Sequence, residues 1–314
     1  MEIPVYLFTG LLESGKTTLI QEVAGEDDFL DPGVTLLIQC EEGEEAFSED
    51  FLKQYRMILL EVEDPEDLNE LFWKRCEKQY HPAQIMIEYN GMWELNAFFD
   101  SGMPVDWFVG GIYSTVNAAT AELYISNMRK IFMEPLRESS LIIFNRCGDD
   151  LDRLKFRRSL KALNPQVQVA FERENGTMYA NEIEEMPFDY SGKTVEVEDM
   201  DYGLWYLDAM DHPERYMGKE IIFTARYCAS KRKTQKYFVP GRHVMTCCED
   251  DIQFLGFVCF FEENVPFEHG DWVKVTVGFD YGECRIYGQD EGPILRLIHI
   301  EEGKRPQQEL VTFT

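Results

Sequence analysis

The chain carries the stretch Gly10-Leu11-Leu12-Glu13-Ser14-Gly15-Lys16-Thr17 directly after a short apolar run, Val5–Thr9, and before a segment with helical spacing. The stretch fits the pattern G-x-x-x-x-G-K-[ST], in which glycines let backbone N–H groups surround phosphate oxygens at the start of a helix. At average glycine usage, chance gives the pattern in roughly one chain in a hundred of this length. The stretch therefore predicts a nucleotide-binding loop at the head of an α/β domain.

Phosphate chemistry assigns roles to this loop and to one carboxylate downstream. Lys16 would reach the β- and γ-phosphates, and the Thr17 hydroxyl would bind Mg²⁺. The strand-like run 85–88 ends in Glu88, where such a site needs a carboxylate for Mg²⁺ or for the attacking water. We expect Lys16, Thr17 and Glu88 to act in catalysis, with Thr17 and Glu88 holding the metal. The nucleotide is expected to contact the whole loop: Gly10, Leu11, Leu12, Glu13, Ser14, Gly15, Lys16, Thr17 and Thr18.

The first 170 residues alternate strand-like and helix-like segments. Helical spacing occurs at Asp67–Lys78, Ala118–Leu136 and Leu151–Leu163. Such alternation predicts an α/β P-loop NTPase domain, with a mostly parallel sheet and helices on both faces. Its strands are expected at Val5–Thr9, Val34–Gln39, Met57–Val62, Gln84–Glu88, Trp107–Val116, Leu141–Asn145 and Val167–Phe171.

From Lys219 the pattern changes to short strands separated by turn residues. This pattern predicts a smaller all-β domain, a closed or half-closed barrel for which the OB type is the candidate. We expect the domains to span residues 1–190 and 191–314. The strands of the second are expected at Glu220–Cys228, Lys236–Thr246, Phe254–Phe260, Trp272–Phe279, Cys284–Gly288 and Ile294–Ile300.

Charge and composition narrow the classes of partner and compartment. The chain has 58 acidic and 30 basic residues, a formal charge of −28, so it repels phosphate backbones and nucleic acid is not expected as a partner. The longest strongly apolar stretch, Phe254–Phe261, is far shorter than the ~20 residues of a membrane-spanning helix, so no direct membrane insertion is expected. The N-terminus shows no signal peptide, and the eight scattered cysteines suit a reducing compartment, so we expect a cytoplasmic protein.

The first domain resembles the CobW-type GTPases, a family of P-loop metallochaperones and metal-insertion proteins. The resemblance is carried by Thr9–Leu19, by the motif Glu88-x-x-Gly91, and by the acidic segment Glu42-Gly43-Glu44, which is similar to the family's switch segment. It covers roughly residues 3–170. It implies GTP and GDP as ligands, Mg²⁺ as cofactor, and Zn²⁺ or another transition metal as cargo.

Two departures from that family affect the site. Its guanine motif [NT]-K-x-D here reads Asn145-Arg146-Cys147-Gly148-Asp149, with Arg for Lys and the Asp one residue late. The resemblance implies that Asn145, Arg146 and Asp149 contact the base, and it leaves guanine preference open. The family's C-x-C-C metal motif is absent, because only Cys40 and Cys76 lie in the interval where it is expected.

The second domain contains a pair of adjacent cysteines, Cys247 and Cys248, followed by an acidic cluster. They are either metal ligands, assisted by Asp251 or His243, or one core and one half-exposed thiol in a strand that ends there. Residues 198–302 are similar to a poorly characterised domain found in small bacterial proteins encoded beside putative permeases. The pattern R-x-x-x-x-C-C-x-x-D, from Arg242 to Asp251, carries this resemblance, which implies metal handling and names no ion.

The sequence therefore supports two functions of different class. The first is a Mg²⁺-dependent GTPase that acts as a switch in metal or metallocofactor handling, with a metal-receiving protein or a membrane permease as partner. The second is a nucleotide-binding scaffold or adaptor with little hydrolysis, working with a permease. A kinase or ATPase acting on a small molecule would need an acceptor pocket that the sequence does not display.

Overall fold

The structure is a computed structural model that describes residues 2–26, 29–180, 186–230, 236–245, 252–262, 265–288 and 291–312. The chain forms two compact units. The first consists of residues 1–153 and 166–181, and the second of residues 154–165 and 182–314.

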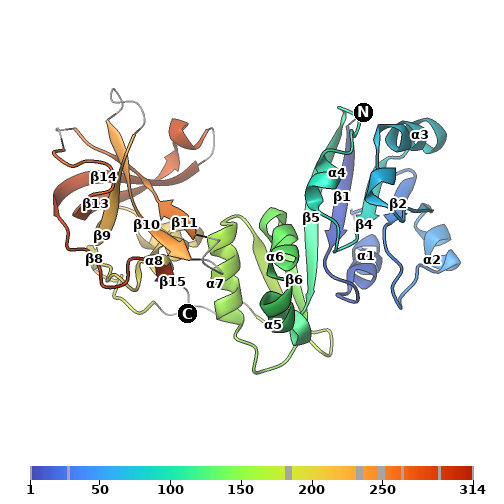
Figure 1. Cartoon of the computed structure of the whole chain (residues 1–314), viewed down its shortest axis with the longest axis horizontal. Helices are drawn as coiled ribbons and strands as arrows, with labels where there is room; N and C mark the ends of the chain where they lie inside the picture. The colour runs from blue at the N-terminus through green and yellow to red at the C-terminus, as the bar shows by residue number, and fades with distance from the viewer. Residues whose placement is uncertain are drawn as a thin grey trace. The chain divides into compact units, whose positions relative to one another are not determined.

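The first unit is built on a parallel seven-stranded sheet with the strand order β3-β2-β4-β1-β5-β6-β7 (Figure 1). Its strands are β1 (Ile3–Thr9), β2 (Thr35–Gln39), β3 (Met57–Glu61), β4 (Gln84–Glu88), β5 (Trp107–Asn117), β6 (Leu141–Cys147) and β7 (Gln168–Arg173). Each begins within two residues of its predicted start. The predicted α/β domain with a mostly parallel sheet is confirmed.

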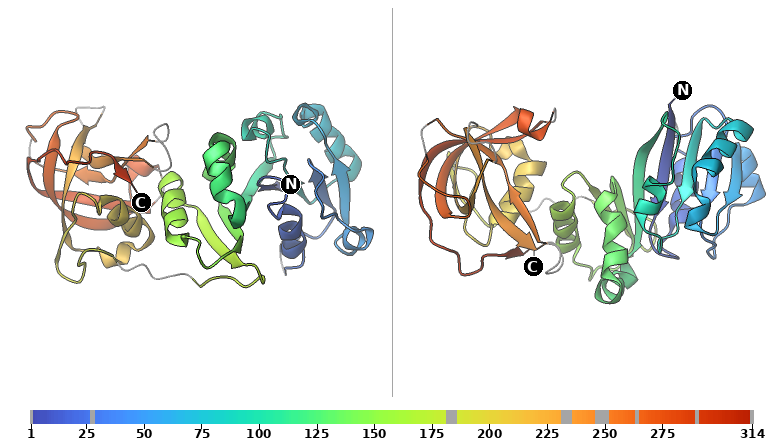
Figure 2. Two further views of the ribbon diagram at one scale, coloured as in Figure 1. Left: turned by 60° about the horizontal axis from the view of Figure 1, so that its bottom comes forward. Right: turned by 45° about the horizontal axis from the view of Figure 1, so that its top comes forward.

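Helices cover both faces of this sheet because successive strand residues point to opposite sides. On one face, Val5 and Leu7 pack against α3 (Glu70–Tyr80) and α4 (Leu95–Phe99). On the other, Phe8 and Met86 pack against α1 (Lys16–Ala24), and α2 (Glu49–Gln54) contributes partly buried side chains. Figure 2 shows the two layers of helices from other directions. The unit also contains the short η1 (Pro65–Asp67).

The predicted helix Ala118–Leu136 is wrong as one element. It divides into α5 (Ala118–Asn127) and α6 (Arg129–Glu138), because Met128 adopts φ −136° and ψ 37°, outside the helical region. Helix α7 (Arg153–Leu163) follows the prediction closely, but its residues from 154 belong to the second unit.

The second unit contains a closed five-stranded barrel, which confirms the predicted β-rich domain. Neighbours around the ring are β9-β10-β12-β14-β13, and β13 pairs with β9 to close it. Strands β12 and β14 are parallel, and the other ring pairs are antiparallel, which is the arrangement of an OB-type barrel. The ring strands are β9 (Glu220–Ala229), β10 (Tyr237–Met245), β12 (Val258–Phe260), β13 (Trp272–Glu283) and β14 (Glu291–Glu302).

Shorter elements surround the ring, namely β8 (Thr194–Glu196), β11 (Ile252–Gly256), β15 (Val311–Thr312), α8 (Tyr202–Asp211), η2 (Pro213–Arg215) and η3 (Arg285–Tyr287). Trp205 of α8 is fully buried, with its ring 4.8 Å from that of Phe223 in β9. Two strand predictions are wrong: Cys284–Gly288 contains the 3-10 turn η3, and Phe254–Phe260 is interrupted at Phe257, which divides it into β11 and β12.

Candidate functional site

The loop between β1 and α1 has a backbone conformation that requires glycine at two positions. Gly10 and Gly15 have φ angles of 135° and 100°, a region that side chains other than glycine's rarely adopt. A Cβ on Gly10 would overlap the backbone oxygen of Thr115 in β5, so the loop lies directly against a neighbouring strand. Ser14 fixes the loop to the same residue, because its Oγ lies 2.8 Å from Thr115 Oγ1. The loop is thereby held in a defined shape at the N-terminus of α1.

Lys16 lies inside this loop. Its Nζ donates hydrogen bonds to the carbonyl oxygens of Gly10, at 2.7 Å, and Leu11, at 3.2 Å. It also forms an ion pair with Glu41, which follows β2, and the side chains of Lys16 and Glu41 are only 3% and 9% exposed. A carboxylate of the chain thus pairs with the ammonium group that would otherwise be available to phosphate oxygens.

Thr17 and Glu88 meet beside Lys16. Thr17 Oγ1 donates to Glu88 Oε1 at 2.6 Å, and Gln39 Nε2 donates to Glu88 Oε2 at 3.0 Å. Burial raises the pKa of Glu88, and the hydrogen bond from Thr17 and the charge of Lys16 oppose that shift. Because β1, β2 and β4 are parallel neighbours, their carboxyl ends bring these side chains together although 71 residues separate Thr17 from Glu88.

The loop that follows β4 touches residues 10–17, the predicted nucleotide-binding loop (hereafter the phosphate loop), through Gly91. A Cβ at this position would overlap the carbonyl oxygen of Gly10, so only glycine fits there. On the opposite side, Glu44 N donates to Glu13 Oε1 at 3.0 Å, which ties the acidic segment after β2 to the phosphate loop. The cavity between them measures only about 30 Å³, and Glu41, Gly43, Glu44 and Glu45 form part of its lining.

A second cavity, of about 510 Å³, lies on the β6–β7 side of the same loop. Asn145 Nδ2 donates to the Ser14 carbonyl at 2.7 Å, and Arg146 Nη1 donates to the Glu13 carbonyl at 2.8 Å. The replacement of Lys by Arg in the motif therefore leaves a cationic donor on the phosphate loop. The cavity is lined by Gly15, Thr18, Leu19, Glu22, Glu26, Thr115, Ile143, Asn145, Arg146, Glu172, Arg173, Glu174, Gly176 and Met178.

Asp149 is placed apart from these residues. It lines neither cavity; its Oδ1 accepts a hydrogen bond from the Tyr179 hydroxyl at 3.0 Å. The Tyr179 ring in turn lies 4.0 Å from the guanidinium of Arg153 and 3.7 Å from that of Arg173. The structure thus brings together the loop residues 10–18, Glu88, Asn145 and Arg146, and it leaves Asp149 bound to an aromatic side chain.

Two residues of the site were missed by the sequence analysis, Glu41 and Gln39. Neither belongs to a motif. The signal available was positional, because both stand at or just beyond the carboxyl end of a buried strand that neighbours the strand of Glu88. In parallel sheets ligands gather at that edge, so strand-end polar residues are candidates as a class.

In the second unit, Cys247 and Cys248 lie outside the described residues, as does Asp251. Arg242 of the same pattern is 1% exposed, and it donates to Asp199 Oδ1 at 3.1 Å and to the Gln308 carbonyl at 2.8 Å. It therefore joins two segments that are distant in sequence. His243 is exposed and packs its ring edge-on against Phe254.

The described part of the chain contains no disulfide, and five of its six cysteines are buried. Burial raises the pKa of the Cys76 thiol to about 11 and raises that of the Cys40 thiol further. Within the same part of the chain, no group of three or more His, Cys, Asp or Glu side chains is arranged to hold a metal ion. No helix among these residues has both the length and the apolarity needed to cross a membrane.

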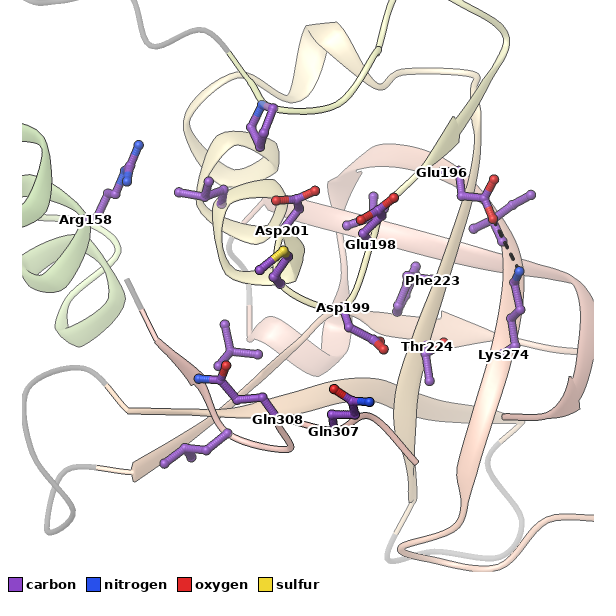
Figure 3. Close-up of a pocket in the computed structure, with 17 residues that line it drawn as sticks. Arg158, Glu196, Glu198, Asp199, Asp201, Phe223, Thr224, Lys274, Gln307 and Gln308 are labelled. Carbon is purple, nitrogen blue, oxygen red and sulfur yellow. Dashed lines mark hydrogen bonds and ion pairs between the residues drawn. The ribbon is translucent and has the colours of Figure 1, made fainter. Parts of the chain in front are cut away.

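A cavity of about 1040 Å³ in the second unit is lined by more acidic than basic side chains (Figure 3). Glu198, Asp199 and Asp201, which precede α8, line it together with Phe223. Glu196 at its rim forms an ion pair with Lys274 at 3.3 Å. Burial, followed by the charge of Glu198, raises the pKa of Asp201.

One protein-family model matches most of the second unit. Residues 161–312 match the model of the DUF1980 C-terminal domain. The match includes the residues whose pattern resembles a poorly characterised domain in the sequence. A comparison with curated proteins gives no match.

Solved structures of low sequence identity are distantly similar to the chain, each with a TM-score below 0.5. Zn(II)-bound YjiA GTPase from E. coli is 17% identical, with 74% of each chain covered and a TM-score of 0.42. The hydrogenase maturation factor HypB from Archaeoglobus fulgidus is 15% identical over 56% of this chain and 84% of its own, with a TM-score of 0.41. HypB from Helicobacter pylori in complex with nickel is 12% identical over 55% and 80%, with a TM-score of 0.37.

Proposed function

We propose that the first unit binds a guanine nucleotide with Mg²⁺ and hydrolyses GTP as a switch in metal or metallocofactor handling. The proposal that the unit binds a nucleotide rests on one observation: Lys16, Thr17 and Glu88 converge around a glycine-containing loop at a helix N-terminus. Backbone N–H groups, an ammonium group and a hydroxyl–carboxylate pair are the groups that phosphoryl transfer requires.

The residues fit Mg²⁺. Thr17 Oγ1 and the Glu88 carboxylate are 2.6 Å apart, and both offer the oxygen ligands that this ion prefers. Bound there, Mg²⁺ would neutralise charge on the β- and γ-phosphate oxygens. Gln39 holds the second carboxylate oxygen, which keeps the first turned toward Thr17.

The switch part rests on the acidic segment after β2. In the structure Glu41 pairs with Lys16 and Glu44 is bound to Glu13, so this segment fills the phosphate site. A triphosphate must displace Glu41 from Lys16, and the segment must move when it does. Nucleotide binding and the position of this segment are therefore linked, which is the requirement for a switch.

The metal part rests on the CobW-type resemblance of the first domain, together with the cysteine pair of the second. Soft thiolates suit Zn²⁺ and other transition metals. A metal-receiving protein or a membrane permease would be the partner, and the cytoplasm the compartment.

Calorimetric titration tests the proposal directly. GDP and ADP are titrated into the full chain in Mg²⁺ buffer, before and after addition of stoichiometric Zn²⁺, and phosphate release from GTP is measured. We expect GDP to bind more tightly than ADP, Zn²⁺ to alter that binding because coupling between ligands is reciprocal, and Lys16→Ala to abolish it. Equal or stronger ADP binding without a Zn²⁺ effect would contradict the proposal.

The same experiment separates the switch from the scaffold. Phosphate release above the uncatalysed background supports the GTPase. Tight nucleotide binding without such release favours the nucleotide-binding scaffold or adaptor.

A further inference from the structure

The end of strand β7 lines the second cavity together with Asn145, the residue that donates to the phosphate loop. Strands β6 and β7 are parallel, with Phe144 opposite Phe171 and, after a register shift, Cys147 opposite Arg173, so Asn145 and Glu172 both lie in the irregular carboxyl ends of these strands. Both line the cavity of about 510 Å³. Asn145 is in turn bound to the Ser14 carbonyl, which fixes the distance of this pair from the phosphate loop.

Four carboxylates line this cavity: Glu22, Glu26, Glu172 and Glu174. Among them Glu172 is half-buried and the other three are exposed. Within the described residues, its carboxylate makes no hydrogen bond or ion pair, whereas the Asp149 carboxylate accepts a hydrogen bond from Tyr179. Its charge reaches across the cavity, since it is the second cause, after burial, of the raised pKa of Glu22.

We propose that Glu172 determines base specificity by accepting hydrogen bonds from the guanine edge. The family resemblance in the sequence assigns this role to Asp149. This inference rests on the proposed function and concerns the same nucleotide. Guanine presents two adjacent donors, N1–H and the 2-amino group, which one carboxylate can accept together. Adenine presents an acceptor at N1 beside its 6-amino group, and a carboxylate repels that acceptor.

The local backbone supports this role. Glu172 lies within β7 and pairs with Met178 in an isolated antiparallel bridge, and a side chain on a strand is positioned more rigidly than one on a loop. Glu172 Oε1 faces Gly176 in the turn after β7, because a Cβ added at Gly176 would lie 3.6 Å from it.

The test replaces the Glu172 carboxylate by an amide and compares guanine with xanthine as the base. Xanthine carries a carbonyl oxygen where guanine carries the 2-amino group, so the amide of Glu172→Gln can donate to it. Affinities of the full chain for GDP, XDP and ADP are measured for the wild type, for Glu172→Gln, and for two controls. Asp149→Asn changes the residue offered by the motif, and Glu174→Gln changes an exposed carboxylate of the same cavity.

We expect Glu172→Gln to weaken GDP binding and to strengthen XDP binding, each at least about tenfold, because unpaired buried donors and acceptors are costly. Both controls should keep the GDP-to-XDP ratio of the wild type. A change in that ratio for Asp149→Asn and not for Glu172→Gln would overturn the inference and leave the proposed function intact. Equal loss of all nucleotides in Glu172→Gln would also overturn it. A wild type that binds no nucleotide, or binds ADP as tightly as GDP, would refute both.

Discussion

Lys16 is paired with a carboxylate of its own chain, and this pairing has an energetic consequence. A nucleotide must compete with Glu41 for the ammonium group, so the measured affinity includes the cost of separating the pair. Under the proposed function, the acidic segment after β2 would therefore lower nucleotide affinity, and its displacement would accompany nucleotide binding.

We expect Glu41→Gln to bind GDP about fivefold to tenfold more tightly than the wild type, because a neutral amide competes less strongly for Lys16. Titration calorimetry measures the change. Glu42→Gln is the matched control, since it removes an adjacent exposed carboxylate that does not line the phosphate cavity. Weaker GDP binding in Glu41→Gln would show that Glu41 acts with the nucleotide instead of against it.

Glu88 gives a prediction that joins stability to activity. Because burial raises its pKa above 4.5, the folded chain binds more protons than the unfolded chain just above that pH. The contribution of Glu88 to the free energy of unfolding therefore decreases as pH rises through this interval. Glu88→Gln should flatten that dependence in denaturant titrations, and it should lower Mg²⁺-dependent phosphate release about a hundredfold or more.

The control for this variant is Glu61→Gln, which changes an exposed carboxylate at the end of β3, a strand that β2 separates from β4. It should leave both quantities unchanged. Full phosphate release by Glu88→Gln would exclude Glu88 from the magnesium site.

Among single residues, the sequence predicts those that belong to a motif with a fixed spacing. Lys16 and Thr17 lie in a recognisable motif, and Glu88 ends an apolar run, so all three could be named in advance. Glu41 could not be distinguished from the surrounding acidic residues, because its pairing with Lys16 depends on the adjacency of strands. Asp149 fits a motif imperfectly, and the structure places it against Tyr179.

At the scale of elements, the contact between the loop after β4 and the phosphate loop depends on Gly91. We expect Gly91→Ala to weaken GDP binding about tenfold or more, because the new methyl group displaces the Gly10 carbonyl, to which Lys16 donates. Gly282→Ala in β13 is the control, since its Cβ would meet open space. Unchanged GDP affinity in Gly91→Ala would mean that the phosphate loop tolerates this displacement.

Elements with clear periodicity could be predicted, and those set by packing could not. The strands of the first sheet are short buried apolar runs between turn residues, so their positions follow from the sequence. Helix α8 was missed because seven of its ten residues are buried, which leaves no polar face to reveal a helical period. The interruption between α5 and α6 at Met128 likewise could not be predicted, because no proline or glycine stands there.

At the scale of the whole molecule, two compact units with separate hydrophobic clusters predict two unfolding transitions. Arg242→Met should lower the transition of the second unit by about 2 kcal/mol or more, because the buried guanidinium joins Asp199 to the segment at Gln308. Differential scanning calorimetry measures this, with GDP added to mark the first unit by raising its transition.

Arg296→Met provides the control, since the guanidinium of Arg296 is exposed and forms only a surface ion pair with Asp280. It should leave both transitions in place. A lowered first transition in Arg242→Met would contradict the assignment of this residue to the second unit alone.

Segments of the two units alternate along the chain, and this limits where the protein can be cut into two folded fragments. Residues 154–165 belong to the second unit but precede β7 of the first, so the chain passes from one unit to the other three times. A protease that cuts once between Ala180 and Met186 would leave α7 on the wrong fragment. The barrel fragment would lose Ala162 from its core and the Lys161 partner of Asp211. During synthesis, too, the first piece of the second unit leaves the ribosome before the last strand of the first.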